Sequence, residues 1–96
     1  MTEKRKQLTG AQIAMRARRQ LAELTGLEPE SVSSMRQDDD GVWKVIVEML
    51  ELSRVPSTDD VIGSYEAEVD ENGELISYDR IRRYPRSKAE EMQRTG

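Results

Sequence analysis

The chain of 96 residues contains no cysteine and no histidine. Without cysteine it has no disulfide, no thiolate nucleophile and no cysteine-based zinc site. Without histidine it lacks the commonest general base near neutral pH and the commonest ligand of transition metals. Carboxylates are therefore left as the main candidates for acid–base or metal chemistry.

Aromatic residues and long apolar runs are also scarce. Aromatics make up 4% of the chain, with no phenylalanine, so aliphatic residues must build the core. The longest apolar run, Val45 to Val47, is far too short to cross a bilayer. The opening MTEKRKQLTG has basic residues but no apolar segment after them, unlike a secretory signal. We expect a single small domain in the cytoplasm, with no membrane insertion.

Charge is present but segregated along the chain. Residues 1–27 carry six basic and two acidic side chains, and residues 80–96 carry the same numbers. Residues 28–79 carry three basic and fifteen acidic side chains, which accounts for the net charge of −4. Such a basic–acidic–basic pattern bears on binding and solubility rather than on fold.

A helix is predicted from about residue 10 to residue 25. Thr9 and Gln12 occupy the two positions of a capping box, and Gly26 can supply a left-handed C-cap. Apolar residues recur at helical spacing along one face: Ile13, Ala14, Ala17, Leu21 and Leu24. Residues 1–8 are charged and lack periodicity, so we expect a disordered basic arm there.

Four strands are predicted after the helix, with residues 27–30 as a connector. Their ranges are 31–37, 42–52, 61–69 and 75–84, separated by turn signals at 38–41, 54–60 and 70–73. Consecutive strands with short connections pair antiparallel, and an amphipathic helix must bury its apolar stripe against one face of the sheet. We therefore predict an α+β domain over 9–86, with one helix on a four-stranded antiparallel sheet and a flexible tail over 87–96.

Alternation assigns the faces of the second strand but not those of the last. Trp43, Val45, Val47 and Met49 share one face, whereas Lys44, Ile46, Glu48 and Leu50 share the other. In the last strand, a two-residue Asn72-Gly73 turn would put Ile76 and Tyr78 on the Val69 face. A three-residue loop with a bulge would put Leu75 there instead.

The acidic residues do not predict an active site. Residues 38–40 and 57–60 lack the spaced oxygen ligands of a calcium loop and are typical of solvated turns. Glu48, Glu51, Glu66 and Glu68 could serve acid–base chemistry, but alternating glutamates are also the ordinary polar face of a half-buried sheet. We assign no catalytic residue, metal ligand or cofactor and expect a protein that is not an enzyme.

Arginines and tyrosines interleave at the end of the last predicted strand and are the main candidate surface for partner binding: Tyr78, Arg80, Arg82, Arg83, Tyr84 and Arg86. They could grip nucleic acid, dock an acidic protein surface, or pair internally with Glu66 and Glu68. The negative net charge counts against nucleic acid. Ile46, Leu50 and Leu52, on the mixed face of the second strand, are the candidates for apolar contact.

Two phrases, ELSRVPSTDDVIGSYE and LISYDRIRRYPR, together with ARRQLAELTGLEPESVSSM before them, resemble the gas vesicle protein O family. The resemblance covers roughly residues 16–86. It implies an intracellular accessory protein needed to build gas vesicles, with shell and other accessory proteins as partners, no enzyme activity and no known cofactor. The alternative hypothesis is a nucleic-acid-binding or regulatory module that uses the arginine cluster. The oligomeric state stays open.

Overall fold

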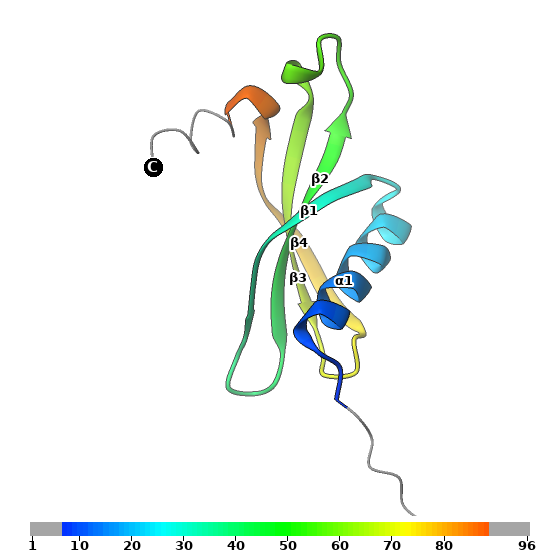
Figure 1. Ribbon diagram of the computed structural model, residues 1–96, viewed down its shortest axis with the longest axis vertical. Coiled ribbons are helices and arrows are strands. Elements are labelled where there is room, and N and C mark those ends of the chain that lie inside the picture. The colour runs from blue at the N-terminus through cyan, green and yellow to red at the C-terminus, as the bar shows by residue number, and fades with distance from the viewer. Residues whose placement is uncertain (1–6, 89–96) are drawn as a thin grey trace, which may run out of the picture.

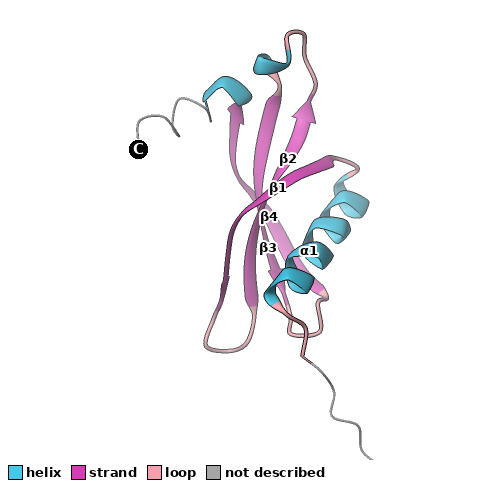
Figure 2. Cartoon of the chain, viewed as in Figure 1, coloured by secondary structure: helices cyan, strands magenta, loops and turns pink. Residues whose placement is uncertain are grey.

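The computed structural model describes residues 7–88 (Figure 1). Its elements are the helix α1 (Gly10–Thr25), the strands β1 (Glu28–Gln37) and β2 (Trp43–Leu52), the short helix η1 (Ser57–Asp59), and the strands β3 (Val61–Val69) and β4 (Leu75–Pro85). The strands form one antiparallel sheet in the order β1-β2-β3-β4, with α1 on one face (Figure 2). The predicted fold class is confirmed. Most of the predicted arm and tail lies outside the described residues.

The predicted capping box and C-cap both define the ends of α1. The amide of Gln12 donates to the Thr9 hydroxyl at 3.1 Å, and the Thr9 amide donates to Gln12 Oε1 at 2.9 Å. Gly26 takes a left-handed φ of 74°, and its amide donates to the Ala22 carbonyl. The apolar stripe was predicted one residue too long, because Leu24 is 61% exposed in the last turn, where α1 leads away from the sheet (Figure 1).

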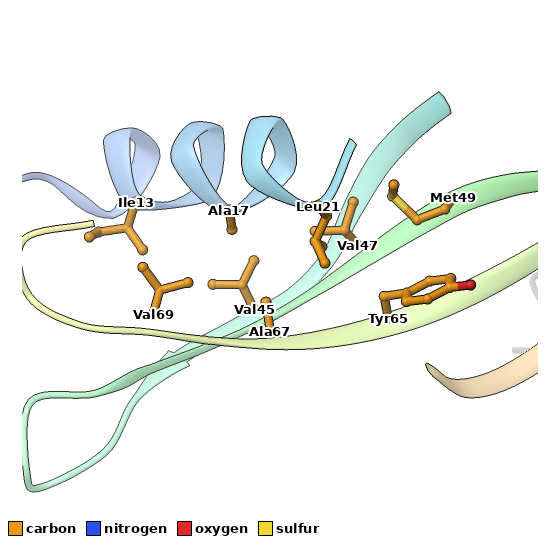
Figure 3. Close-up of a cluster of buried hydrophobic side chains, with 9 residues drawn as sticks. All are labelled: Ile13, Ala17, Leu21, Val45, Val47, Met49, Tyr65, Ala67 and Val69. Carbon is orange, nitrogen blue, oxygen red and sulfur yellow. The ribbon is translucent and has the colours of Figure 1, made fainter. Parts of the chain in front are cut away.

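The apolar core lies between α1 and the face of the sheet that α1 covers, which we call the helix face (Figure 3). Ile13, Ala17 and Leu21 from α1 are fully buried against residues of β2 and β3. The sheet contributes Val45, Val47, Met49, Tyr65, Ala67 and Val69. The opposite face, which we call the open face, carries Ile46 and Glu48 as the alternation of β2 predicts.

Both edge strands extend further than predicted. β1 begins at Glu28 rather than at residue 31, and β4 ends at Pro85 rather than at Tyr84. Pro29 pairs with Met49, and Pro85 pairs with Val61. Proline lacks an amide donor, but an edge strand needs hydrogen bonds on only one side, so both prolines are tolerated at these positions.

The hairpin between β3 and β4 has the three-residue loop with a bulge. The Asp70 amide donates to the Glu74 carbonyl at 2.9 Å, and Gly73 takes a φ of 86°. Leu75 consequently lies opposite Val69, as that alternative predicted. A register shift at Ile76 then returns Tyr78 to the helix face, opposite Ala67.

Register shifts interrupt the ladder five times. The extra residues at these shifts are Glu30 and Ser33 in β1, Glu51 in β2, and Ile76 and Ile81 in β4. Because Glu51 is extra, Leu52 pairs with Val61 and does not continue the alternation from Ile46 and Leu50. A bulge of this kind bends a strand and turns its side chain to a new direction.

Truncation of Leu21 to alanine should destabilise the domain by about 2–5 kcal/mol, because Leu21 is fully buried in a close-packed core. The matched change Leu24→Ala, on the exposed last turn, should cost less than about 0.5 kcal/mol. Urea unfolding followed by circular dichroism measures both. Equal effects would contradict the placement of the helix on the sheet.

Candidate functional site

A carboxylate at the centre of the open face gathers one hydroxyl group from each of the other three strands. Glu48, on β2, is 7% exposed. Its Oε1 accepts from the Ser64 hydroxyl of β3 and the Tyr84 hydroxyl of β4, both at 2.6 Å. Its Oε2 accepts from the Ser33 hydroxyl of β1 at 2.6 Å. We call these four residues and Arg82 the Glu48 cluster.

The cluster depends on both pairing and bulges. Ser64 lies directly opposite Glu48 in the ladder, and Tyr84 lies two positions along β4 from Arg82, the residue opposite Ser64. Ser33 reaches Glu48 because it is the extra residue at a register shift in β1. Alternation along β1 gives two different answers for Ser33. Counting from Val32 places its side chain on the open face, whereas counting from Ser34 places it on the helix face.

The cluster sets the ionisation of its own members. Burial alone raises the pKa of Glu48, but the hydrogen bonds from Ser33, Ser64 and Tyr84, together with the charge of Arg82, lower it overall. Burial and the neighbouring Glu48 carboxylate raise the pKa of Tyr84 to about 12. Glu48 is therefore an anion and Tyr84 a neutral donor across the physiological range.

Arg82 and two isoleucines form the exposed border of this cluster. The Arg82 guanidinium stacks 4.8 Å from the centre of the Tyr84 ring. Arg82, Ile81 and Ile46 line a cavity of about 240 Å³, whose floor includes Glu48. Ile81 is 51% exposed and reaches this position as the extra residue of a bulge. The cavity thus combines the apolar side chains of the two isoleucines, the positive charge of Arg82 and the negative charge of Glu48.

A second carboxylate, Glu51, gathers the polar groups of the helix face beyond the apolar core. Its side chain is 8% exposed and accepts from the Tyr65 hydroxyl at 2.7 Å. The guanidinium groups of Arg80 and Arg83 each lie 3.1 Å from Glu51 Oε1. Gly63 lies directly beneath, and a Cβ there would collide with the Glu51 carboxylate. The missing side chain at Gly63 makes room for this group.

Arg86 connects the bulge of β1 to the start of β3. Its Nη1 and Nη2 donate to the two carboxylate oxygens of Glu30 at 3.0 and 2.6 Å, a bidentate geometry. Its Nη2 also donates to Asp60 Oδ2 at 3.1 Å. Asp60 also accepts a hydrogen bond from the Arg54 amide at 2.7 Å. This hydrogen bond and the contact with Arg86 keep the pKa of Asp60 below its usual value despite burial.

Three of the four predicted arginines therefore have carboxylate partners inside the protein. The partners expected for internal pairing were wrong, because Arg80, Arg83 and Arg86 bind carboxylates other than Glu66 and Glu68. Glu68 instead pairs with Lys44 at 3.0 Å. The physical reason is the bulges, which redirect Glu51 and Glu30 toward the arginines. Arg82 alone among the four has no carboxylate partner within residues 7–88.

The remaining predicted residues are dispersed. Tyr78 lies on the helix face, with its ring centre 6.3 Å from that of Tyr65. Ile46 and Leu50 lie on the open face and are half-buried. Leu52 is 42% exposed and is separated from them by the bulge at Glu51. The structure thus brings Ile46, Arg82 and Tyr84 together but not the whole predicted set.

Sequence reasoning missed the residues that organise the site. Ser33, Ser64 and Ile81 carried no motif, and Glu48 and Glu51 were assigned to an ordinary polar face.

Among residues 7–88 no three acidic, cysteine or histidine side chains converge as a metal site. The acidic turn residues Asp40 and Asp70 accept hydrogen bonds from nearby backbone amides.

The fold and site define a small α+β domain whose sheet is covered by a helix on one face and organised by a buried carboxylate on the other. A family model described as gas vesicle synthesis protein GvpO matches residues 1–90. The chain belongs to this family, and the resemblance drawn from its sequence is confirmed.

Three curated relatives agree with the family model. Gas vesicle protein O of Streptomyces sp. (strain CB03234) is 55% identical over 71 residues, which cover 74% of this chain. Gas vesicle protein O of Haloferax mediterranei is 34% identical over 88% of the chain, and gas vesicle protein O1 of Halobacterium salinarum is 34% identical over 79%. The matched segments span 55%, 59% and 63% of these relatives.

No solved structure matches this chain. In the part of the chain that the structure describes, no helix has the length and hydropathy needed to cross a membrane.

Removal of the Tyr84 hydroxyl by Tyr84→Phe should destabilise the domain by about 1–3 kcal/mol, because a buried carboxylate oxygen loses a donor. The ring that stacks under Arg82 is kept. The matched change Tyr78→Phe, at a hydroxyl with no protein partner in the described region, should cost less than about 0.5 kcal/mol. Urea denaturation distinguishes the two, and a neutral Tyr84→Phe variant would contradict the cluster.

The pH dependence of stability should report the Glu48 carboxylate. Its pKa is lower in the folded protein than its ordinary value of 4.5, so folding favours the charged form. This contribution is complete above pH 4.5 and is lost as the pH falls through the lowered value. The difference in melting temperature between the wild type and Glu48→Gln should therefore shrink below pH 4.5. A difference that stays constant or grows on acidification would oppose this assignment.

Proposed function

We propose that this chain is a non-enzymatic accessory protein of gas vesicle formation that acts by binding other gas vesicle proteins, either shell or accessory components. Family membership supports the cellular process. The observation that carries the binding proposal is the open face, where Ile46, Ile81 and Arg82 surround a cavity of about 240 Å³ that no described element covers. Apolar and arginine side chains in a preformed depression are typical of protein–protein contact.

The order of this surface supports binding rather than catalysis. Glu48 is held by three hydroxyl donors and its pKa is lowered, so its carboxylate is a poor general base. The same hydrogen bonds hold the surrounding strands in place before a partner arrives. A preformed surface loses less conformational entropy on binding than a mobile one.

The alternative function, nucleic-acid binding through the arginine cluster, receives less support. Arg80, Arg83 and Arg86 are already paired with carboxylates, which reduces the positive charge that a phosphate backbone would meet. We place the protein in the cytoplasm in association with gas vesicles, where its partners are made and assembled.

The test is deletion of the gene from a vesicle-forming cell, followed by rescue with variants. Ile46→Asp places a charge in the apolar wall of the open face and should abolish both flotation and co-purification of gas vesicle proteins. Met15→Asp likewise replaces an apolar side chain with aspartate, at a residue of α1 that is 62% exposed. This variant should restore flotation fully.

Thermal melting of both purified variants checks that they fold, and Ile46→Ser provides a milder change if Ile46→Asp does not. Normal flotation without the gene would refute the role in assembly. Equal rescue by a folded Ile46 variant and by Met15→Asp would refute the open face as the binding surface.

A further inference from the structure

The outer edge of β4 is the most exposed stretch of the sheet. Residues 76–83 are all exposed, and α1 packs chiefly against β1, β2 and β3. Three of the seven large apolar side chains that are exposed in the described region lie on this strand: Ile76, Tyr78 and Ile81. An edge strand presents unpaired backbone donors and acceptors, which a further strand can bind.

Two charged side chains of β4 have no ionic partner within residues 7–88, namely Asp79 and Arg82. Asp79 lies opposite Glu66, and Arg82 lies opposite Ser64, so both occupy the open face. Residues three positions apart normally point to opposite faces of a strand. Here the bulge at Ile81 brings Asp79 and Arg82 onto the same face.

We propose that the outer edge of β4 pairs with the same edge of a second copy of this chain, antiparallel and related by a two-fold axis at Arg80, with Ile81 of each copy left out of the pairing as the bulged residue. In this register Asp79 faces Arg82 of the second copy, and Arg82 faces its Asp79. The symmetry makes both ion pairs at once, as an isologous interface requires. Opposite charges on directly facing residues of neighbouring strands stabilise their pairing.

The same register is consistent on both faces of the extended sheet. At the axis Arg80 faces Arg80 of the second copy, and each of these charges is already paired with Glu51 of its own chain. Tyr78 and Arg83, both on the helix face, oppose each other across the axis and allow an arginine–aromatic contact. Ser77 and Tyr84 oppose each other on the open face.

The β1 edge offers no comparable site. The charged residues of β1 are Glu28, Glu30 and Arg36. Glu30 is bound to Arg86, and Arg36 lies 3.7 Å from Asp38, so β1 has no acidic and basic residue that are both without an ionic partner in the described region. Self-complementary charge therefore singles out the β4 edge and a second copy as its occupant.

Charge reversal tests the proposal. Asp79→Arg and Arg82→Asp each place like charges opposite one another twice, so each alone should weaken dimerisation by about tenfold or more. A 1:1 mixture of these two variants should form a heterodimer, because one chain then carries two arginines and the other two aspartates. The double variant Asp79→Arg/Arg82→Asp should dimerise with itself.

Size-exclusion chromatography with light scattering measures mass across a concentration series. Asp39→Arg, at an exposed position in the turn between β1 and β2, is the control that should still dimerise. The recovery of dimer in the mixture separates loss of pairing from loss of fold. A wild-type chain that stays monomeric at its highest soluble concentration overturns the proposal. Single variants that dimerise like the wild type overturn it as well. Neither result affects the binding role of Ile46, which is tested separately.

Discussion

The open face depends on the Glu48 carboxylate. Removal of an ion from water costs several kcal/mol even in a relaxed protein. Each hydrogen bond to a charged group returns about 1.5–3 kcal/mol, and Glu48 accepts three of them. The lowered pKa of Glu48 indicates that these bonds and Arg82 outweigh its burial. A charge that would otherwise destabilise the sheet thus fixes β1, β3 and β4 around β2.

The two faces of the sheet are stabilised in different ways. The helix face buries aliphatic side chains under α1, and these side chains carry no titratable group. The open face is held by a carboxylate and hydroxyl groups, with Arg86 joining Glu30 to Asp60 near one end. Such a polar network remains ordered without a covering layer, so the face can stay exposed to solvent.

Much of the fold follows from local signals in the sequence. The capping box at Thr9, Gly26 at the helix end and the turn around Gly73 each act through nearby backbone, so they could be recognised without the fold. The site could not be recognised in this way, because Ser33, Glu51 and Ile81 obtain their positions from bulges. A bulge depends on how two strands fit together across the sheet, which residue alternation along one strand does not contain.

Membership of the gas vesicle protein family indicates the process, and the pairing of three arginines with internal carboxylates leaves Arg82 and its aliphatic neighbours as the distinctive exposed group. This arrangement leaves less unpaired positive charge on the surface than the four arginines alone would suggest. Arg80, Arg83 and Arg86, which the sequence alone predicts to be a binding surface, therefore have a structural role.

A double-mutant cycle between Glu48→Gln and Tyr84→Phe tests most directly whether the carboxylate organises the open face. Unfolding free energies of the wild type, both single variants and the double variant give the coupling between the two side chains. The account predicts a coupling of at least about 1 kcal/mol, with the double variant less destabilised than the sum of the single changes. Strictly additive effects would show that Glu48 and Tyr84 act independently, and would contradict the account.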